Sequence, residues 1–139
     1  MTTSTPPARS LALAVALGAG VGGVVRVLVG TAALRWLDHD FPHGVLAVNV
    51  TGSFLIGLLM ALTAADGRWP LGPAVRAGAM AGFCGGFTTF SFFSLQTLEL
   101  LQAGRIIAAV LYAGITLAGA LTAVWLGYAA GMRLNRRPA

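Results

Sequence analysis

The stretch GFCGGFTTFSFF, Gly82–Phe93, lies inside an apolar segment long enough to cross a membrane. Three glycines, two threonines and a serine stand where lipid-facing leucine would be least costly, together with five phenylalanines. Gly78, Gly82 and Gly86 form a GxxxGxxxG ridge, against which another helix backbone can pack closely. With Gly85 added, we predict that this helix breaks in the middle of the membrane and leaves carbonyl groups without their helical donors.

The composition of the whole chain predicts a membrane protein. Of its 139 residues, 57% are hydrophobic and 9% are charged, which is more apolar surface than a soluble domain of this size can bury. A helix needs about 20 residues to cross the hydrocarbon core. Four segments reach that length: Leu11–Ala33, Gly44–Ala65, Gly72–Leu98 and Ile106–Gly131. We therefore predict an all-α, four-helix transmembrane domain over residues 11–131, a disordered tail at 1–10 and a basic tail at 132–139.

The arginines predict the orientation of the chain. If the loops alternate between the two sides of the membrane, one side carries six arginines and the other carries two. The six are Arg9, Arg68, Arg76, Arg133, Arg136 and Arg137, and the two are Arg35 and Arg105. The positive-inside rule then places both termini of this multi-pass protein in the cytoplasm, with the spans in the cell membrane. Arginines near span ends also explain the net charge of +5 without any nucleic-acid partner.

Several classes of function are disfavoured. The acidic residues, Asp38, Asp40, Asp66 and Glu99, all lie in loops or at span ends, whereas a proton-coupled drug exporter ordinarily needs a carboxylate in mid-span. The chain has no nucleotide-binding loop and no Ser/His/Asp set, and its histidines, His39 and His43, share one polar loop and are expected to be solvated, so we predict no enzyme activity. The single cysteine, Cys84, forms no intrachain disulfide and is expected to pack inside the third span.

Polar residues inside the spans are the candidates for function, because each is costly in lipid. Arg26 lies about two-thirds of the way along the first span, and either snorkels to the nearer interface or draws anions into an aqueous vestibule. On the same helix, Gly18 and Gly22 form a GxxxG pair that permits close packing.

Two pairs at i, i+4 spacing place hydrogen-bonding groups on one face of the second and fourth spans. Asn49 and Ser53 form the first pair; Asn49 either bonds between helices or offers its NH2 group to an anion. Tyr112 and Thr116 form the second pair. Tyr112 is either a donor in a pore or an aromatic residue of the membrane interface, and Thr116 either donates to a pore or bonds its own helix backbone.

Phe90 and Phe93 are three residues apart in the third span and therefore share a face. Either they pack against lipid or another helix, or they present positively polarised ring edges to an anion.

These residues resemble those of the Fluc/CrcB fluoride channels. The resemblance rests on GFCGGFTTFSFFS in the third span, NVTGSFLIG in the second and GAGVGGVVR in the first, and it covers nearly the whole chain. It implies an antiparallel, dual-topology dimer of four-helix subunits with a broken third helix and two fluoride pores along the subunit interface. The implied activity is passive export of fluoride, which confers fluoride resistance.

The resemblance also implies which residues take part. A structural sodium ion is expected between the subunits, held by the backbone carbonyls of Gly85 and Thr88. The fluoride pore is assigned to Asn49, Phe90, Phe93, Tyr112 and Thr116, with Thr89 and Ser91 in the polar stretch and Arg26 on the arginine of the first helix.

Three positions depart from the family pattern. Gln96 stands where many relatives carry glutamate, Val45 replaces a common threonine, and Phe92 replaces a small polar residue. Each change removes polarity or charge from an expected vestibule wall. The arginine bias favours one orientation, so we hypothesise pairing with an oppositely oriented paralogue. The alternatives are a small four-helix multidrug transporter and a non-conducting membrane scaffold.

Overall fold

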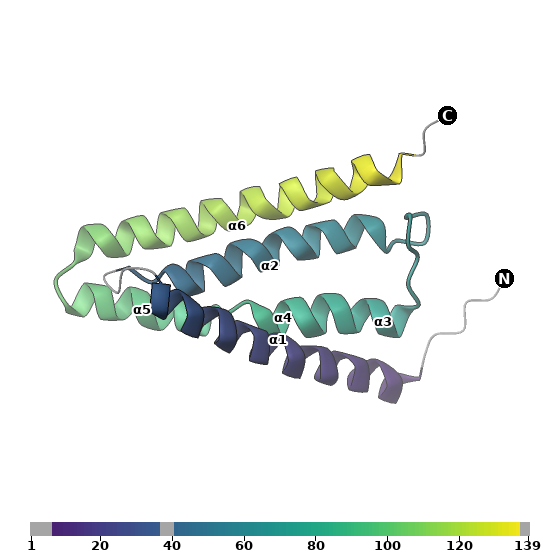
Figure 1. Ribbon diagram of the computed structural model, residues 1–139, viewed down its shortest axis with the longest axis horizontal. Helices are drawn as coiled ribbons and strands as arrows, with labels where there is room; N and C mark the ends of the chain where they lie inside the picture. The colour runs from purple at the N-terminus through teal and green to yellow at the C-terminus, as the bar shows by residue number, and fades with distance from the viewer. Residues whose placement is uncertain (1–6, 37–40, 137–139) are drawn as a thin grey trace.

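The computed structural model describes residues 7–36 and 41–136, and all the regular secondary structure in these ranges is helical. Its elements are α1 (Ala8–Trp36), α2 (His43–Leu62), α3 (Pro73–Ala77), the π-helix η1 (Gly78–Cys84), α4 (Gly85–Phe87), α5 (Ser91–Gln102) and α6 (Ile106–Asn135). The elements α3, η1, α4 and α5 follow one another in a single crossing, so the chain crosses the molecule four times (Figure 1). Three of these crossings, in α1, α2 and α6, are unbroken helices long and apolar enough to span a membrane.

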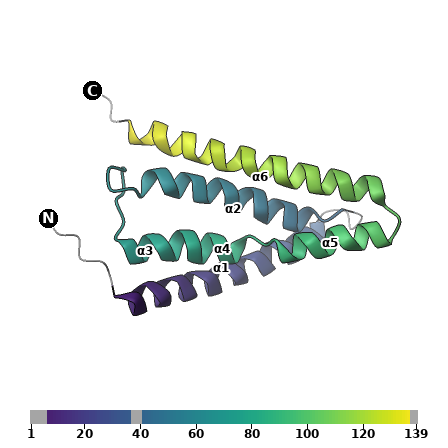
Figure 2. The ribbon, with the colours of Figure 1, turned by 180° about the vertical axis from the view of Figure 1, so that it is seen from behind.

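The four crossings alternate in direction (Figures 1 and 2). α2 packs mainly on α6, and α1 packs mainly on η1 and α4. The start of α1, the end of α2, the start of α3 and the end of α6 lie at one end of the molecule (Figure 1). The end of α1, the start of α2, the end of α5 and the start of α6 lie at the other. The structure confirms the predicted all-α, four-helix architecture.

The N-terminal boundary differs from the prediction. α1 begins at Ala8 rather than at Leu11, so the last residues of the predicted tail are helical. The hydroxyl of Ser10 donates to the carbonyl of Pro7 at 2.8 Å, which stabilises the first turn. The remainder of the predicted tail, residues 1–6, lies outside the described residues.

The C-terminal boundary also differs, because α6 continues past Gly131 to Asn135. The side chain of Asn135 donates to the carbonyl of Ala61 at 2.9 Å and accepts the backbone N–H of Arg68 at 2.8 Å. These bonds fasten the last turn of α6 to the end of α2 and to the loop that follows it. Helix α2 ends at Leu62, three residues before its predicted end. Residues 132–135, half of the predicted basic tail, are therefore helical, and residues 137–139 lie outside the described residues.

The predicted break in the third span is confirmed. Helix α4 ends at Phe87, Thr88 is extended with φ −81° and ψ 162°, and α5 begins at Ser91. Gly52 of α2 faces this break: a Cβ there would overlap the methyl group of Thr88 and approach the Phe87 ring to 3.2 Å. The absence of a side chain on α2 thus makes room for the turn in the third span. The seven-residue π-helix before the break was not predicted; such wide turns often occur at functional sites.

Two glycine seams hold the helices together. The first joins α1 to the third span and contains Gly18, Gly22, Gly78, Gly82 and Gly86. A Cβ at Gly22 would overlap the carbonyl of Phe83, so the backbones are in direct contact, as the GxxxG spacings predict. The second seam joins α2 to α6 through Gly57, Gly127 and Gly131. A Cβ at Gly57 would overlap the carbonyl of Val124.

Candidate functional site

Asn49 holds the break open from α2. Its Nδ2 donates to the carbonyl of Thr89 at 2.9 Å, and the N–H of Thr89 donates to its Oδ1 at 2.8 Å. One carboxamide thereby satisfies a donor and an acceptor that an unbroken helix would pair internally. Of the two predicted roles for Asn49, the interhelical bond is present, and the second N–H of the same amide takes no part in this pair of bonds.

Thr89 uses its side chain to start the next helix. Its hydroxyl accepts the backbone N–H of Phe92 at 3.2 Å, as a helix-capping threonine does, and lies 3.2 Å from the hydroxyl of Ser91. Thr89 is buried and Ser91 is exposed. Both residues of the predicted polar stretch therefore lie at the start of α5, where their hydroxyls meet.

Arg26 reaches the break from α1 instead of snorkelling to the interface. Its Nη1 donates to the carbonyl of Thr88 at 3.2 Å, and its guanidinium lies 5.9 Å from the centre of the Phe92 ring. The side chain is half-buried. These contacts place a fixed positive charge beside the broken helix.

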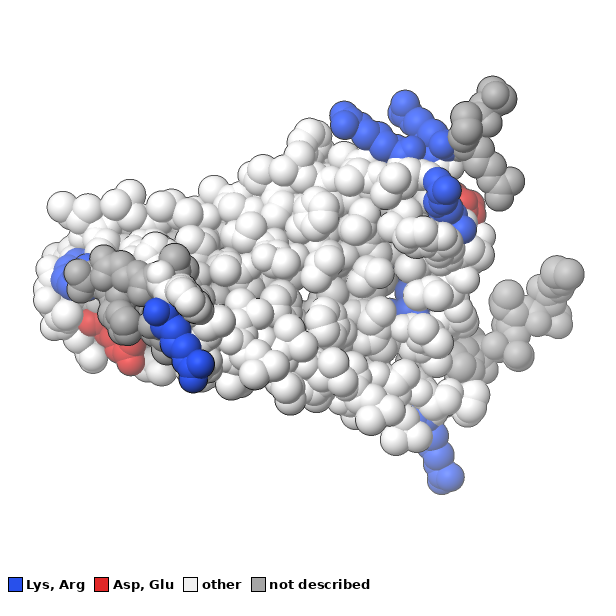
Figure 3. Space-filling model, viewed as in Figure 1, with Lys and Arg blue, Asp and Glu red and all other residues white. Residues whose placement is uncertain are grey.

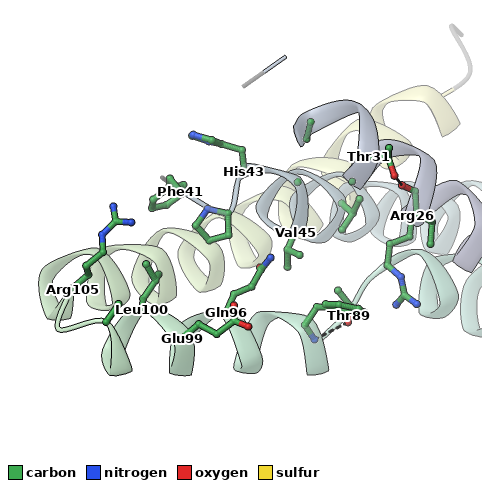
Figure 4. Close-up of a pocket in the computed structure, with 18 residues that line it drawn as sticks. Arg26, Thr31, Phe41, His43, Val45, Thr89, Gln96, Glu99, Leu100 and Arg105 are labelled. Atoms are coloured by element: carbon green, nitrogen blue, oxygen red, sulfur yellow. Dashed lines mark hydrogen bonds between the residues drawn. The ribbon is translucent and has the colours of Figure 1, made fainter. Parts of the chain in front are cut away.

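Arg26 lines the larger of two pockets, called here the outer pocket, with a volume of about 520 Å³. Its polar and charged side chains come from α1, α2, the break, α5 and the loop before α6: Arg26, Thr31, His43, Thr89, Gln96, Glu99 and Arg105 (Figure 4). The three departures from the family pattern, Val45, Phe92 and Gln96, also line it. The three positions, one in α2 and two in α5, thus lie around one pocket.

The smaller pocket, called here the inner cavity, has a volume of about 220 Å³ and is the more open of the two. It is lined by Asn49, Ser53, Thr88, Thr89, Phe90, Phe93, Thr116, Leu117 and Ala120, all of which are uncharged. Thr89 lines both pockets. The hydroxyl of Thr116 is buried and has no hydrogen-bond partner among the described residues, so the alternative that it bonds its own helix backbone is wrong.

A row of four aromatic rings runs from the inner cavity past Tyr112 of α6 to Phe41. The rings of Phe90 and Phe93 lie 5.6 Å apart, that of Phe93 lies 5.3 Å from Tyr112, and Tyr112 meets Phe41 edge to face at 5.5 Å. Phe90 is 75% exposed and Phe93 only 8%. Tyr112 is 0% exposed, so it is not an interfacial aromatic residue. Its hydroxyl donates to Oε1 of Gln96 at 2.9 Å, which places it behind Phe93 rather than in the lining of either pocket.

The residues predicted to hold sodium lie just before and at the break. Because the N–H of Thr89 donates to Asn49, the carbonyl of Gly85 loses the donor that a continuous helix would supply. Gly85 is exposed, and a Cβ there would have nothing within 4 Å. The carbonyl of Thr88 accepts one bond, from Arg26, and retains a second lone pair. No group of three His, Cys, Asp or Glu side chains among the described residues could hold a metal.

Sequence reasoning missed two features of this site. His43 was expected to be solvated, but it is half-buried in the outer pocket with its ring 5.0 Å from that of Phe41; His39 lies outside the described residues. The bond between Gln96 and Tyr112 was also missed. Gln96 follows Phe93 by three residues, so its position on the same face of α5 was a usable signal.

The fold and these two pockets define a multi-pass helical membrane protein with an uncharged, hydroxyl- and ring-lined cavity beside a broken helix. Residues 13–128 match the family described as CrcB-like protein, Camphor Resistance (CrcB), and the chain belongs to this family.

Curated relatives are similar over most of their length. The chain is 48% identical to "Fluoride-specific ion channel FluC 1" of Rhodopseudomonas palustris (strain BisB18) over 122 residues, 88% of this chain and 86% of the relative. It is 47% identical to "Fluoride-specific ion channel FluC" of Acidobacterium capsulatum over 120 residues, 86% of this chain and 94% of the relative. It is 42% identical to the protein of the same name from Methylocella silvestris over 120 residues, 86% of this chain and 92% of the relative.

Proposed function

We propose that this chain forms a fluoride-selective, passive channel that exports fluoride across the cell membrane. The names of its relatives support the class of transported ion. The observation that carries the proposal is the hydroxyl of Thr116, which is buried at the inner cavity without a partner among the described residues. A buried donor without an acceptor costs about 1–3 kcal/mol, and an anion that accepts from this hydroxyl would remove that cost while it is bound.

The lining of the inner cavity suits a small anion. The Thr116 hydroxyl, the second N–H of Asn49 and the ring edges of Phe90 and Phe93 can all point positive charge inward. A small, strongly hydrated halide needs several such donors to replace its water. A larger halide such as chloride gains less from the same lining. Cations are disfavoured because no carboxylate lines the cavity.

The outer pocket provides an access route in this proposal. Arg26 raises the local concentration of anions there, and Thr89 forms a wall common to both pockets. An anion would leave its hydration shell as it passes from the outer pocket to the inner cavity.

We further propose an antiparallel dimer. Phe90, Phe92, Leu95 and Leu98 are exposed apolar side chains of α5 and the break, and a second chain would cover them. The unequal arginines at the two ends favour a single orientation for this chain, so an oppositely oriented paralogue is the proposed partner.

A structural sodium ion fits the proposed dimer centre. The Gly85 carbonyl, which has lost its helical donor, and the Thr88 carbonyl, which keeps a second lone pair, both offer hard oxygen ligands. The open space over Gly85 would admit a second chain with the same pair of carbonyls. When bound, sodium would supply positive charge next to the inner cavity and join the two subunits. Arg26 would share the Thr88 carbonyl with it.

The two alternative functions have less support. The described carboxylates, Asp66 and Glu99, are exposed and lie near the ends of the spans, which does not suit a drug exporter that binds cations in mid-membrane. A non-conducting scaffold would explain the glycine seams, but it would leave the unpartnered Thr116 hydroxyl without a reason.

Fluoride efflux from loaded liposomes, read by a fluoride electrode, tests the proposal. Efflux is expected from this chain together with its partner, with chloride retained. Phe90→Ile and Phe93→Ile should each strongly reduce fluoride efflux, whereas Phe83→Ile, a ring stacked on Phe87 before the break, should not. Equal release of fluoride and chloride, or normal efflux from both variants, would contradict it. Robust efflux by this chain alone would rule out an obligate paralogue.

A further inference from the structure

The two ends of the molecule differ strongly in charge (Figure 3). Among the described residues, one end carries Arg9, Arg68, Arg76, Arg133 and Arg136 with a single carboxylate, Asp66. We call it the basic end. The opposite end carries Arg35, Arg105 and Glu99. Every cationic residue of the chain is an arginine, although lysine would serve a purely topological role as well.

Two arginines of the basic end are held in place by neutral groups. Nη1 of Arg68 donates to the carbonyl of Leu134 at 3.1 Å. Nε of the half-buried Arg76 donates to the hydroxyl of Thr63 at 3.2 Å. Neither bond neutralises a charge, and in the described part of the chain neither arginine pairs with a carboxylate. Each guanidinium also keeps N–H groups beyond those in these bonds.

Exposed apolar side chains also lie at the basic end. Trp69, one residue after Arg68, is 59% exposed, and Leu71, Met132 and Leu134 are also exposed. Tryptophan at a span end is typical of the headgroup region of a bilayer. This neighbourhood favours a membrane-bound ligand over a soluble one, because the apolar side chains can contact acyl chains while the arginines contact a headgroup.

We propose that the basic end binds the phosphate groups of anionic phospholipids in preference to zwitterionic ones. The planar fork of guanidinium matches the phosphate oxygens of either lipid class, and the preference arises because an anionic headgroup lacks the ammonium charge that offsets the phosphate of a zwitterionic one. An arginine near an anionic surface contributes about a fivefold preference. α1 alone has 29 residues and is therefore about 43 Å long, several Debye lengths, so the arginines of the opposite end do not contribute at this site.

Quenching of Trp69 by brominated lipid measures this preference directly. Trp36→Phe and Trp125→Phe leave Trp69 as the single reporter. The full chain is reconstituted in vesicles of phosphatidylglycerol and phosphatidylcholine in equal amounts, with one or the other lipid brominated. Brominated phosphatidylglycerol is expected to quench Trp69 more, corresponding to a preference of about fivefold or more. Equal quenching by the two lipids would overturn the proposal.

Single substitutions assign the preference to the basic end. Arg133→Gln and Arg136→Gln change exposed side chains for which no hydrogen bond is described, so folding is expected to be unaffected, and each should lower the preference up to about fivefold. Arg76→Gln should lower the preference for anionic lipid to a similar extent. Arg35→Gln, an equal loss of charge at the opposite end, should leave this preference unchanged. A similar loss in Arg35→Gln would show a non-specific effect of net charge and contradict the proposal. Fluorescence requires no ion flux, so this result is independent of the proposed channel activity.

Discussion

The two halves of the third crossing are held by different means. The first half, α3, η1 and α4, lies against α1 through the first glycine seam, where backbone meets backbone (Figure 2). The second half, α5, is held by side chains: Asn49 and Arg26 bond the break, and Tyr112 on α6 bonds Gln96. The same crossing is thus rigidly packed before the break and bonded through polar side chains after it.

This difference suggests that the first half of the crossing determines the stability of the fold and the second half determines the selectivity for the ion. Close backbone contact leaves no room for a side chain, so the first half fixes where the break lies. Polar side chains after the break can present donors to an ion without a full charge. We therefore expect substitutions in the first half to affect folding most and those around the inner cavity to affect conduction most.

The largest effect is expected at the first glycine seam. Gly22→Val would force a side chain into the carbonyl of Phe83 and should lower the free energy of unfolding by about 3 kcal/mol or more. The matched control is Gly23→Val, since a Cβ at Gly23 has nothing within 4 Å. Denaturant titration in detergent measures both. Equal stability of the two variants would contradict the distinction between the two halves of the crossing, because the first half would then not depend on backbone contact.

The next largest effect is expected at Asn49, whose two hydrogen bonds to the backbone of Thr89 form a clamp on the break. Asn49→Leu fills a similar volume but leaves the N–H and the carbonyl of Thr89 without partners, so we expect a loss of about 2 kcal/mol. Fluoride efflux should fall as well, because the break loses its shape. Ser53→Ala, on the same face and lining the same cavity, should change stability little. If Asn49→Leu were as stable as Ser53→Ala, the two bonds to Thr89 would not hold the break.

The sequence predicted the break and the close packing of a helix on the glycine ridge, because both follow from glycine spacing along the third span, but it did not identify α1 as the helix that packs there. It did not predict the clamp, because helical spacing gives the face on which Asn49 lies but not the backbone group that it meets across the interface. It did not predict the surroundings of Tyr112 for the same reason: Tyr112 shares a face with Thr116, yet only tertiary packing brings its ring against Phe93 and its hydroxyl to Gln96. The second seam could have been found, since Gly127 and Gly131 are also in GxxxG spacing.

A smaller effect is expected where α5 bonds α6. Gln96→Leu would leave the fully buried hydroxyl of Tyr112 without an acceptor and should lower stability by about 1–2 kcal/mol. Tyr112→Phe in the same chain removes the orphaned group, so the double variant should regain much of that loss. A double-mutant cycle of denaturant titrations measures the coupling. Purely additive changes would mean that the bond does not fasten the second half.

The smallest effect on stability is expected at Thr116, and it is the sharpest test of the division between packing and conduction. Thr116→Val keeps the shape of the side chain and removes a buried hydroxyl that has no partner among the described residues, so the free energy of unfolding should change by less than about 0.5 kcal/mol or increase. Fluoride efflux should nevertheless fall about tenfold, as loss of one donor worth about 1.4 kcal/mol implies. Thr122→Val, at an exposed position of the same helix, is the matched control and should preserve efflux. If Thr116→Val lowered stability and left efflux unchanged, the hydroxyl would serve the fold, and the inner cavity would lose its role as the place where the ion is bound.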